Sequence, residues 1–204
     1  MFVPAHNTSR RQGTTVTVPS DGHPLSVADA KRQLRIDSDD TSLDEHVSQL
    51  VAAAHRHVEN ALGFPIMRQT RRTSLYGFPC GLLWLGGGVN LTVVSVKYYD
   101  TDGVQQTMTG SEYIVDAVSR PAYVMAAPLK TWPVAQTRPG AVEVEWQAGW
   151  VNPSDVPEDI LHAMKLLIGH WDQNREAVVV GSISTAIDMA VDALLFPHRV
   201  TMVA

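Results

Sequence analysis

The spacing of the hydrophobic residues changes twice along this chain, and this pattern constrains its fold more than any other feature. Apolar residues recur at helical spacing over residues 27–35 and 43–62, alternate within short segments between 66 and 148, and return to helical spacing after residue 157. Helical spacing is typical of amphipathic helices and alternation of half-buried strands. The sequence therefore predicts an α+β fold, in which a small helical core of about four helices carries an inserted antiparallel β subdomain.

The ends of the first two helices carry their own signals. Ser26 is a good N-cap for a helix over residues 27–35, and Asp29 follows three positions later. Ser42 and Glu45 predict a second capping box, at the start of a long helix that runs to residue 62. Gly63 suits the left-handed position that follows a helix end.

The last quarter of the chain predicts two further helices. Pro157 suits a first helical turn, and an apolar stripe follows it from Ile160 to Trp171. Residues 177–187 read as a loop or a strand. A short last helix is expected over about residues 189–195, ending at Pro197.

The middle of the chain predicts about seven short strands, within residues 66–75, 82–85, 94–98, 104–108, 113–115, 122–125 and 142–146. The tetrapeptide 100–103 (DTDG) predicts a tight hairpin in which Gly103 takes a positive φ. Residues 1–24 read as an extended arm with a short strand over 14–18, either disordered or ordered only against a neighbour. We therefore divide the chain into the arm 1–24, helical core 25–65, β insertion 66–150, and a second helical part with a C-terminal tail, 151–204.

Composition and charge limit the compartments in which the protein is expected and the partners that it is expected to bind. The 204 residues include 16 Lys and Arg against 21 Asp and Glu, a net charge of −5. Tight DNA binding needs cations that neutralise phosphates, so we expect no sequence-specific DNA binding. No apolar run reaches the length of a membrane span, the N-terminus lacks a secretory apolar core, and Cys80 is the single cysteine. We expect synthesis in a reducing cytoplasm and no membrane partner.

The motifs of common enzymes are missing from the sequence. The glycines at 86–88 lack the lysine of a phosphate loop, and Asp37, Asp39 and Asp40 lack the Gly and Glu of a calcium loop. His162 and His170 have no further ligand at metal-site spacing. We therefore expect no catalytic residue, no cofactor and no metal. Trp146 and Trp171 fit core positions, whereas Trp132 and Trp150 beside turns fit either a protein interface or a carbohydrate-binding surface.

Three stretches of the sequence together resemble one family. They are residues 25–62, 131–150 (TWPVAQTRPGAVEVEWQAGW) and 155–181, and the most specific part runs from Asp155-Val156-Pro157 through His170-Trp171 to Asn174-Arg175-Glu176. In order and character they resemble the head–tail connector (adaptor, or head-completion) proteins of long-tailed bacteriophages and prophages. Ala193-Leu194-Leu195 with Pro197 and Arg199 also fits the family's ending, whereas residues 1–24 lie outside the common pattern.

This resemblance implies a non-enzymatic virion protein at the head–tail junction. Family members form a ring, generally of twelve copies, beneath the portal of the capsid. The ring connects the portal to the stopper or tail and leaves a channel through which double-stranded DNA passes. The alternatives are another neck component such as a stopper or tail terminator, a small carbohydrate-binding module that uses the tryptophans, and a hydrolase with a dispersed site.

Two groups of residues are candidates for contacts in such a ring. In the first hypothesis residues 188–204 dock on the portal, with Leu194, Leu195 and Phe196 as apolar anchors and Arg199 as a polar clamp. The alternative is that this last helix covers the protein's own core. In the second hypothesis acidic side chains face the channel and repel DNA, and the candidates are Asp37, Asp39, Asp40, Asp44 and Glu45.

Overall fold

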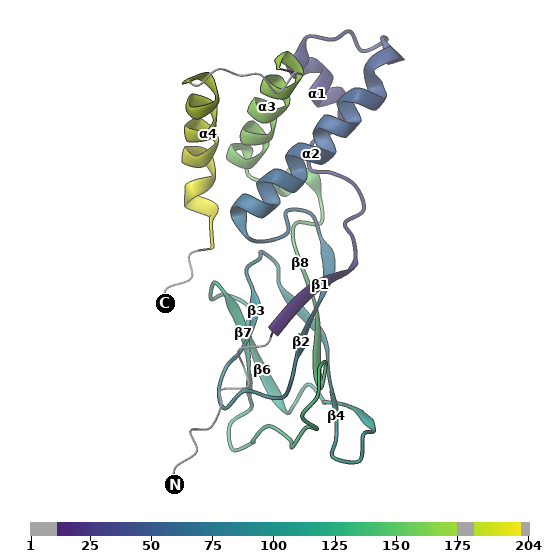
Figure 1. Ribbon diagram of the computed structural model, residues 1–204, viewed down its shortest axis with the longest axis vertical. Helices are drawn as coiled ribbons and strands as arrows, with labels where there is room; N and C mark the ends of the chain where they lie inside the picture. Colours follow the sequence, from purple (N-terminus) through teal and green to yellow (C-terminus); the bar gives the residue numbers. More distant parts are fainter. Residues whose placement is uncertain (1–11, 175–181, 201–204) are drawn as a thin grey trace. The chain divides into compact units, whose positions relative to one another are not determined.

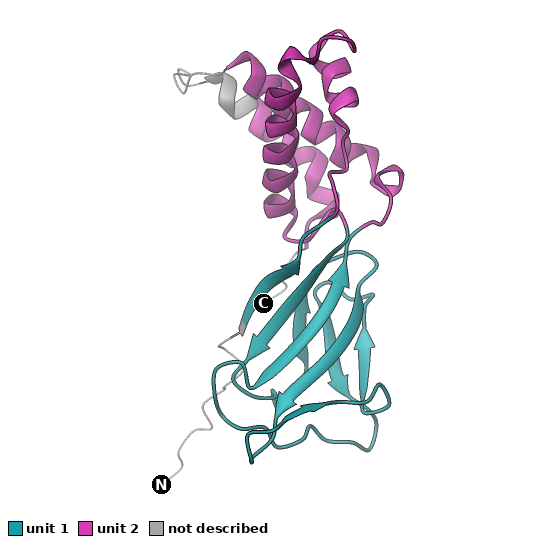
Figure 2. Cartoon of the chain, turned by 90° about the vertical axis from the view of Figure 1, so that its right-hand side faces the viewer, with its two compact units in different colours: residues 1–20, 68–149, 201–204 teal, residues 21–67, 150–200 magenta. Residues whose placement is uncertain are grey.

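The computed structural model describes residues 12–174 and 182–200, which fall into two compact units (Figure 2). The β unit contains residues 12–20 and 68–149, and the helical unit contains residues 21–67, 150–174 and 182–200. The described chain has four α-helices and eight strands, and every strand pairing is antiparallel. This confirms the predicted α+β fold.

The helical unit buries one apolar face of each of its helices. The four helices are α1 (Val27–Leu34), α2 (Asp44–Leu62), α3 (Glu158–Gln173) and α4 (Ser182–Leu195), of which α3 packs on both α2 and α4 (Figure 1). The core combines α2 side chains with the stripe of α3, and it includes Val47, Val51, Val58, Ile160, Met164 and Ile168. The helices of the two sequence halves thus share one core, which supplies the tertiary packing on which short helices depend.

The start of α2 differs from the prediction. Ser42 does not cap the helix; instead the Asp40 carboxylate accepts hydrogen bonds from the backbone N–H (3.0 Å) and hydroxyl (2.5 Å) of Ser42. These bonds open a 3₁₀ turn over Thr41–Leu43, and α2 follows at Asp44 without a side-chain cap. A carboxylate is the stronger acceptor, so Asp40 takes the position that the capping-box pattern gave to Ser42. The expected ends at Ser26 and Gly63 are confirmed.

Helix α4 is longer than predicted. Residues 182–187 are helical, so the expectation of a loop or strand is wrong there, while residues 177–181 lie outside the described residues. Three apolar side chains four residues apart, Ile187, Val191 and Leu195, pack on the helical core. Burial of this stripe overrides the strand preference of the β-branched residues before it.

The β unit contains two sheets. Its strands are β1 (Gln12–Val18), β2 (Gln69–Leu75), β3 (Leu83–Gly86), β4 (Thr92–Tyr99), β5 (Gln105–Thr107), β6 (Tyr113–Asp116), β7 (Ala122–Ala126) and β8 (Val142–Ala148). One sheet has the order β1-β2-β8-β4-β5 and the other the order β3-β7-β6. The seven predicted strands are confirmed, as is the positive φ of Gly103 (79°) in the β4–β5 hairpin.

A second apolar core lies within the β unit. Trp146 is fully buried there, as predicted, and its indole N–H donates to the Thr73 hydroxyl at 2.9 Å. Trp171 is partly buried and packs against the core of the helical unit. In residues 12–174 and 182–200 no helix combines the length and apolar character required to span a membrane.

Strand β1 corrects the expectation for the N-terminal arm. Residues 12–18 are neither disordered nor dependent on a neighbouring molecule, because they pair with β2 of the same chain. Side chains add to this pairing: the Thr14 and Thr73 hydroxyls lie 3.1 Å apart, and the Thr17 hydroxyl donates to the Thr70 carbonyl at 3.2 Å. The five consecutive β-branched residues at 14–18 favour such an edge strand.

Candidate functional site

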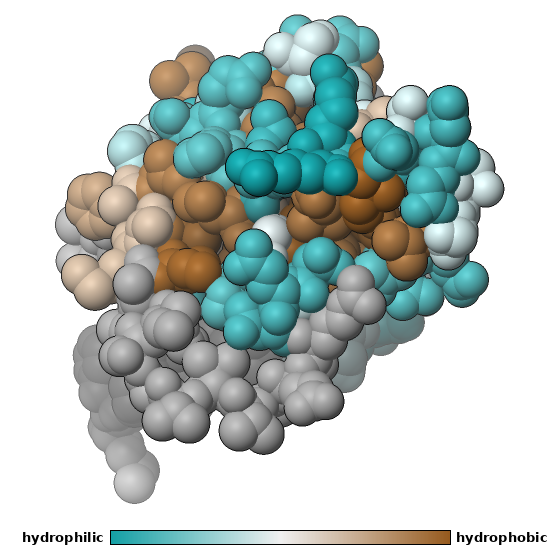
Figure 3. All heavy atoms as spheres, turned by 90° about the horizontal axis from the view of Figure 1, so that it is seen from above, coloured by the Kyte–Doolittle hydropathy of each residue, from teal (hydrophilic) through white to brown (hydrophobic). Residues whose placement is uncertain are grey.

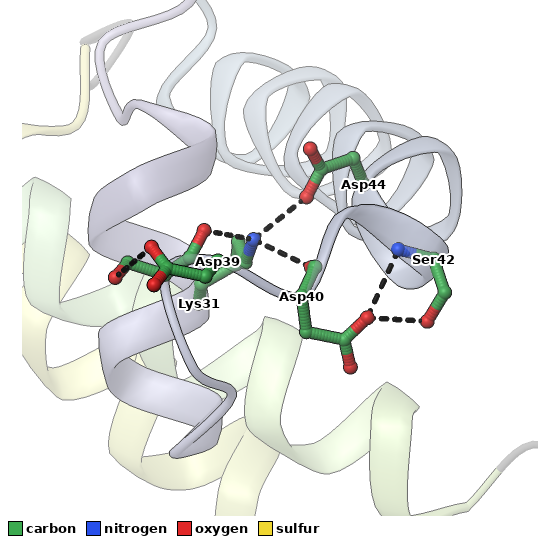
Figure 4. A network of polar contacts seen from close by, with 6 residues as sticks. Lys31, Asp39, Asp40, Ser42 and Asp44 are labelled. Atoms are coloured by element: carbon green, nitrogen blue, oxygen red, sulfur yellow. Dashed lines mark hydrogen bonds and ion pairs between the residues drawn. The ribbon is translucent and has the colours of Figure 1, made fainter.

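The acidic segment between α1 and α2 is organised around one buried lysine. Only 5% of Lys31 is exposed, and its ammonium donates to the carbonyl oxygens of Ser38 (3.0 Å) and Asp40 (2.8 Å). It also forms an ion pair with the Asp44 carboxylate at 2.9 Å (Figure 4). These contacts fix the shape of residues 38–44 from the inside.

The five acidic residues predicted to face a channel lie on and beside this segment. Asp37, Asp39, Asp40 and Glu45 are exposed, whereas Asp44 is half-buried and its charge is compensated by Lys31. Hydrogen bonds from the side chain and the backbone of Ser42 lower the pKa of Asp40, so it stays ionised. The segment therefore presents four negative charges on a shaped backbone.

Lys31 itself was not among the predicted site residues. The sequence does contain a signal for it, because Val27, Ala30, Lys31 and Leu34 share one helix face at positions i, i+3, i+4 and i+7. A lysine within an apolar stripe must bury its stem and find acceptors for its ammonium.

An apolar cavity of about 380 Å³ lies beside this network. It is lined by Val27, Ala28, Lys31, Arg32, Ile36, Ser38 and Asp44. Figure 3, which looks onto the helical unit from above, shows hydrophobic side chains reaching the surface in patches separated by hydrophilic ones. The helical unit thus presents one cavity, apolar surface patches and negative charges to a protein partner.

The predicted docking residues at the C-terminus have different environments. Leu195 is fully buried in the helical core and Leu194 is partly buried against it, so both hold α4 in place. Phe196, by contrast, is 74% exposed, and Arg199 forms an ion pair with Asp192 at 2.5 Å. The surface left for a partner is therefore centred on Phe196.

Met189 was missed among these residues. It is 68% exposed and lies seven positions before Phe196, with the exposed Ala193 between them. Met189 and Ala193 lie four positions apart on α4, and Phe196 follows in the 3₁₀ turn Phe196–His198. All three are exposed, unlike the buried stripe of Ile187, Val191 and Leu195. The spacing of these residues is visible in the sequence. The sequence does not show, however, which of the two apolar stripes is buried and which is exposed.

A pair of histidines connects the segment before α1 to α2. The Nδ1 atoms of His23 and His55 lie 2.9 Å apart, and Nε2 of the buried His55 lies 3.4 Å from the Glu59 carboxylate. That carboxylate also accepts a hydrogen bond from the backbone N–H of Ile66 at 2.7 Å. Burial and the proximity of His55 lower the pKa of His23, an effect that Glu59 partly opposes. Within the described residues no group of three or more His, Cys, Asp or Glu side chains could hold a metal ion.

Two tryptophans of the β unit, Trp84 and Trp132, pack against other aromatic side chains. Trp132 stacks on Phe78 with ring centroids 4.8 Å apart, and its indole N–H donates to the Gly81 carbonyl at 3.1 Å. Trp84 packs edge-on against Tyr123 at 5.3 Å. Both tryptophans are therefore held in place by an aromatic neighbour, as anchors of a protein interface would be.

Comparison with solved structures finds likeness over nearly the whole chain. A chain of the virion of a native gene transfer agent (GTA) particle superposes with a TM-score of 0.75 at 19% identity, covering 94% of this chain and 97% of that one. A chain from the neck of native GTA particle, computed with C12 symmetry, gives 0.73 at 20% identity with the same coverage. A chain from the neck of the empty particle, computed with C6 symmetry, gives 0.68 at 19%.

The likeness shows the fold. No protein-family model matches the chain, and no curated protein matches its sequence. The superposition covers 94% of this chain at 19–20% identity, so it includes both units.

Proposed function

We propose that this chain is a structural protein of the neck of a phage-like particle, an adaptor that forms a closed ring between the portal and the tail-side proteins. The observation that carries this proposal is the fold likeness over 94% of the chain to a chain from a particle neck computed with C12 symmetry. The resemblance of residues 25–62, 131–150 and 155–181 to head–tail connectors supports the same role independently. The proposal places the protein in the virion, at the head–tail junction, after synthesis in the host cytoplasm.

The ring is proposed to contain twelve copies around a DNA channel. A closed ring requires two different contact surfaces on each copy. The described surface supplies several: the acidic segment with its neighbouring cavity, the outer stripe of α4, and the edges of the two sheets. The net charge of −5 suits a channel through which DNA passes without adhering.

The channel lining is proposed to include the exposed carboxylates of Asp37, Asp39, Asp40 and Glu45, with Asp44 as the residue that anchors the segment to Lys31. Fixed negative charges repel phosphates at short range, so they lower friction on the moving duplex. Rings in which the four exposed residues are replaced by Asn or Gln should hold duplex DNA more tightly at low salt than wild-type rings. Equal DNA retention by both rings would remove these residues from the channel.

Portal docking is proposed to centre on Phe196, with Leu194 and Arg199 beside it. Leu195 instead packs in the helical core and holds α4 in place. Phe196 stands in the 3₁₀ turn directly after α4, and an exposed aromatic side chain is a typical interface anchor. Phe196→Ser should keep the free energy of unfolding within about 0.5 kcal/mol of the wild type, because its side chain is mostly in solvent. The same change should abolish attachment to portal-bearing heads. Normal attachment of the folded variant would refute this contact.

The experiment that tests the function as a whole is deletion of the chain in a host that produces the particle. The proposal predicts separate DNA-filled heads and complete tails, which join when the wild-type protein is added back. A deletion host that still releases tailed particles would overturn the proposal. A tail terminator would bind to the separated tails instead of the heads, so adding labelled protein to the separated parts distinguishes that role from the adaptor.

A further inference from the structure

Three titratable side chains in contact with one another, His23, His55 and Glu59, take no part in the surfaces proposed above. His23 lies in the link between β1 and α1, and the other two lie one turn apart on α2. The Nδ1 atoms of the histidines are 2.9 Å apart, and Nε2 of His55 is 3.4 Å from the Glu59 carboxylate. The two rings meet edge to face at an interplanar angle of 87°. Ring nitrogens therefore join the link to α2.

The surroundings of His55 determine where the protons of the pair lie. A neutral imidazole has one N–H and one lone pair, so a hydrogen bond between two Nδ1 atoms needs a proton on one and a lone pair on the other. Nε2 of His55 is buried and faces the Glu59 carboxylate, which can only accept. A lone pair there would oppose the carboxylate, so Nε2 of His55 carries its proton. Nδ1 of His55 then accepts from the Nδ1–H of His23, and Nε2 of His23 keeps a lone pair.

This arrangement limits the number of protons that the closed pair can bind. His23 is exposed, so a first added proton can bind its Nε2 without disturbing the contact between the Nδ1 atoms. A second added proton would make both rings cations, and two N–H donors would then face each other. The closed pair thus holds at most three ring protons, whereas separated rings hold four. Below about pH 6.5, each pH unit therefore favours the separated rings by up to about tenfold.

The charged groups near the pair lie on the link and on α2. Burial and the charge of His55 lower the pKa of His23, and Glu59 opposes this only in part. Asp21, on the link itself, is exposed. Two ion pairs join α2 to neighbouring helices, and both lie in its first turn: Lys31–Asp44 with α1 and His46–Asp172 with α3. Glu59 is therefore the carboxylate that acts on the pair among the described residues.

The link is fixed on both sides of His23. Strand β1 pairs with β2 as far as Val18, and Leu25, only 4% exposed, packs in the helical core. Gly22, directly before His23, has φ +97°, a conformation that favours glycine. We propose that His23, His55 and Glu59 form a proton-operated latch, which holds residues 19–24 on α2 at neutral pH and releases them in acid. The latch belongs to the single chain and does not depend on the proposed function.

The pH of release follows from two opposing effects. A hydrogen bond between neutral groups favours the closed pair by about two- to twelvefold. The extra proton of the separated rings favours release by up to about tenfold for each pH unit below about 6.5. We therefore expect release between about pH 6 and about pH 5.

The proton positions are tested on the wild-type chain alone. Proton–nitrogen NMR correlation spectra of the full-length protein with labelled histidines distinguish a ring protonated on Nδ1, on Nε2 or on both. At about pH 7.5 we expect the proton of His55 on Nε2 and that of His23 on Nδ1. His162, exposed on α3, serves as the reference ring. A proton on Nδ1 of His55, or protons on Nε2 of both rings, would overturn the inference.

Release is measured in the same protein as the backbone order parameter of residues 21–23. In the wild type it should fall from about 0.85 at neutral pH to below about 0.6 at about pH 5. His23→Gln should stay ordered throughout, because a glutamine amide can donate to His55 and gains no charge. Glu59→Gln should release the link at a higher pH than the wild type, because the closed pair loses the negative charge that favours its protons. His162→Gln is the matched control and should behave as the wild type.

Three results of this titration would overturn the inference. The first is an ordered link in the wild type at about pH 5. The second is release of the link in His23→Gln at the wild-type pH, or release in Glu59→Gln at or below that pH. The third is a loss of order throughout the helical unit together with the link, because acid would then unfold the core instead of opening a latch.

Discussion

Replacement of Lys31 by methionine removes the centre of the α1–α2 connection while keeping the length and shape of its side chain. The change deletes three hydrogen bonds from a charged donor, at 2.8–3.0 Å, and leaves the carbonyls of Ser38 and Asp40 without that partner. Hydrogen bonds to charged groups contribute about 1.5–3 kcal/mol each, and a buried acceptor that loses its donor costs about 1–3 kcal/mol. The lost ion pair with Asp44 contributes little to this cost, because the Asp44 side chain is 45% exposed and its carboxylate can be hydrated instead. Allowing for the burial of the methionine, we expect a loss of about 2–4 kcal/mol in the free energy of unfolding.

Urea denaturation followed by circular dichroism measures this loss. Arg56→Met is the matched control, since Arg56 is exposed on α2 and its replacement should change the free energy of unfolding by less than about 0.5 kcal/mol. Asp44→Asn should lower the free energy of unfolding by an amount between those for Arg56→Met and Lys31→Met, because Lys31 keeps both of its carbonyl acceptors. If Lys31→Met cost no more than the Arg56 control, the lysine would not organise the acidic segment, and the reasoning from buried charge would be refuted.

Three further predictions concern packing and protonation. Gly88→Ala should lower the free energy of unfolding by about 1–3 kcal/mol, because an added Cβ would lie 2.7 Å from the Cβ of Ala148; an unchanged urea midpoint would contradict this packing. Leu195→Ala should cost about 2–5 kcal/mol, since Leu195 is fully buried in the helical core, and a cost below 1 kcal/mol would show α4 to be loosely attached. The lowered pKa of His23 means that the unfolded chain binds more protons, so stability should fall as the pH drops from about 6.5 towards the folded-state pKa. In thermal melts at several pH values, His23→Gln should lose less stability at low pH than the wild type. If the two proteins lost the same stability, the His23–His55 contact would not be the cause of the fall.

The helix and strand elements were predictable because their apolar spacing is strict. The stripe of α3 and the alternation of β8 each fix an element and its buried face. The sequence did not predict that residues 182–187 are helical, since their β-branched residues favour a strand and only packing on the helical core decides the outcome. The pairing of β1 with β2 was also missed, because strand partners distant in sequence leave no local signal.

The candidate surfaces were predictable only in part. The acidic residues and the C-terminal apolar residues were recognisable by type, but their burial was not, so Leu195 and Phe196 seemed equivalent although one is buried and the other exposed. The central role of Lys31 depends on backbone carbonyls that come into range only when the connection folds back over α1.

The central claim, that this chain forms a ring in the neck of a phage-like particle, is tested most directly by a cryo-electron microscopy reconstruction of the neck of particles that contain it. The account predicts a closed ring of twelve copies of this fold around the DNA path, with Phe196 on the portal side. A neck reconstruction that lacks this fold, or that holds it as single copies outside any ring, would contradict the account.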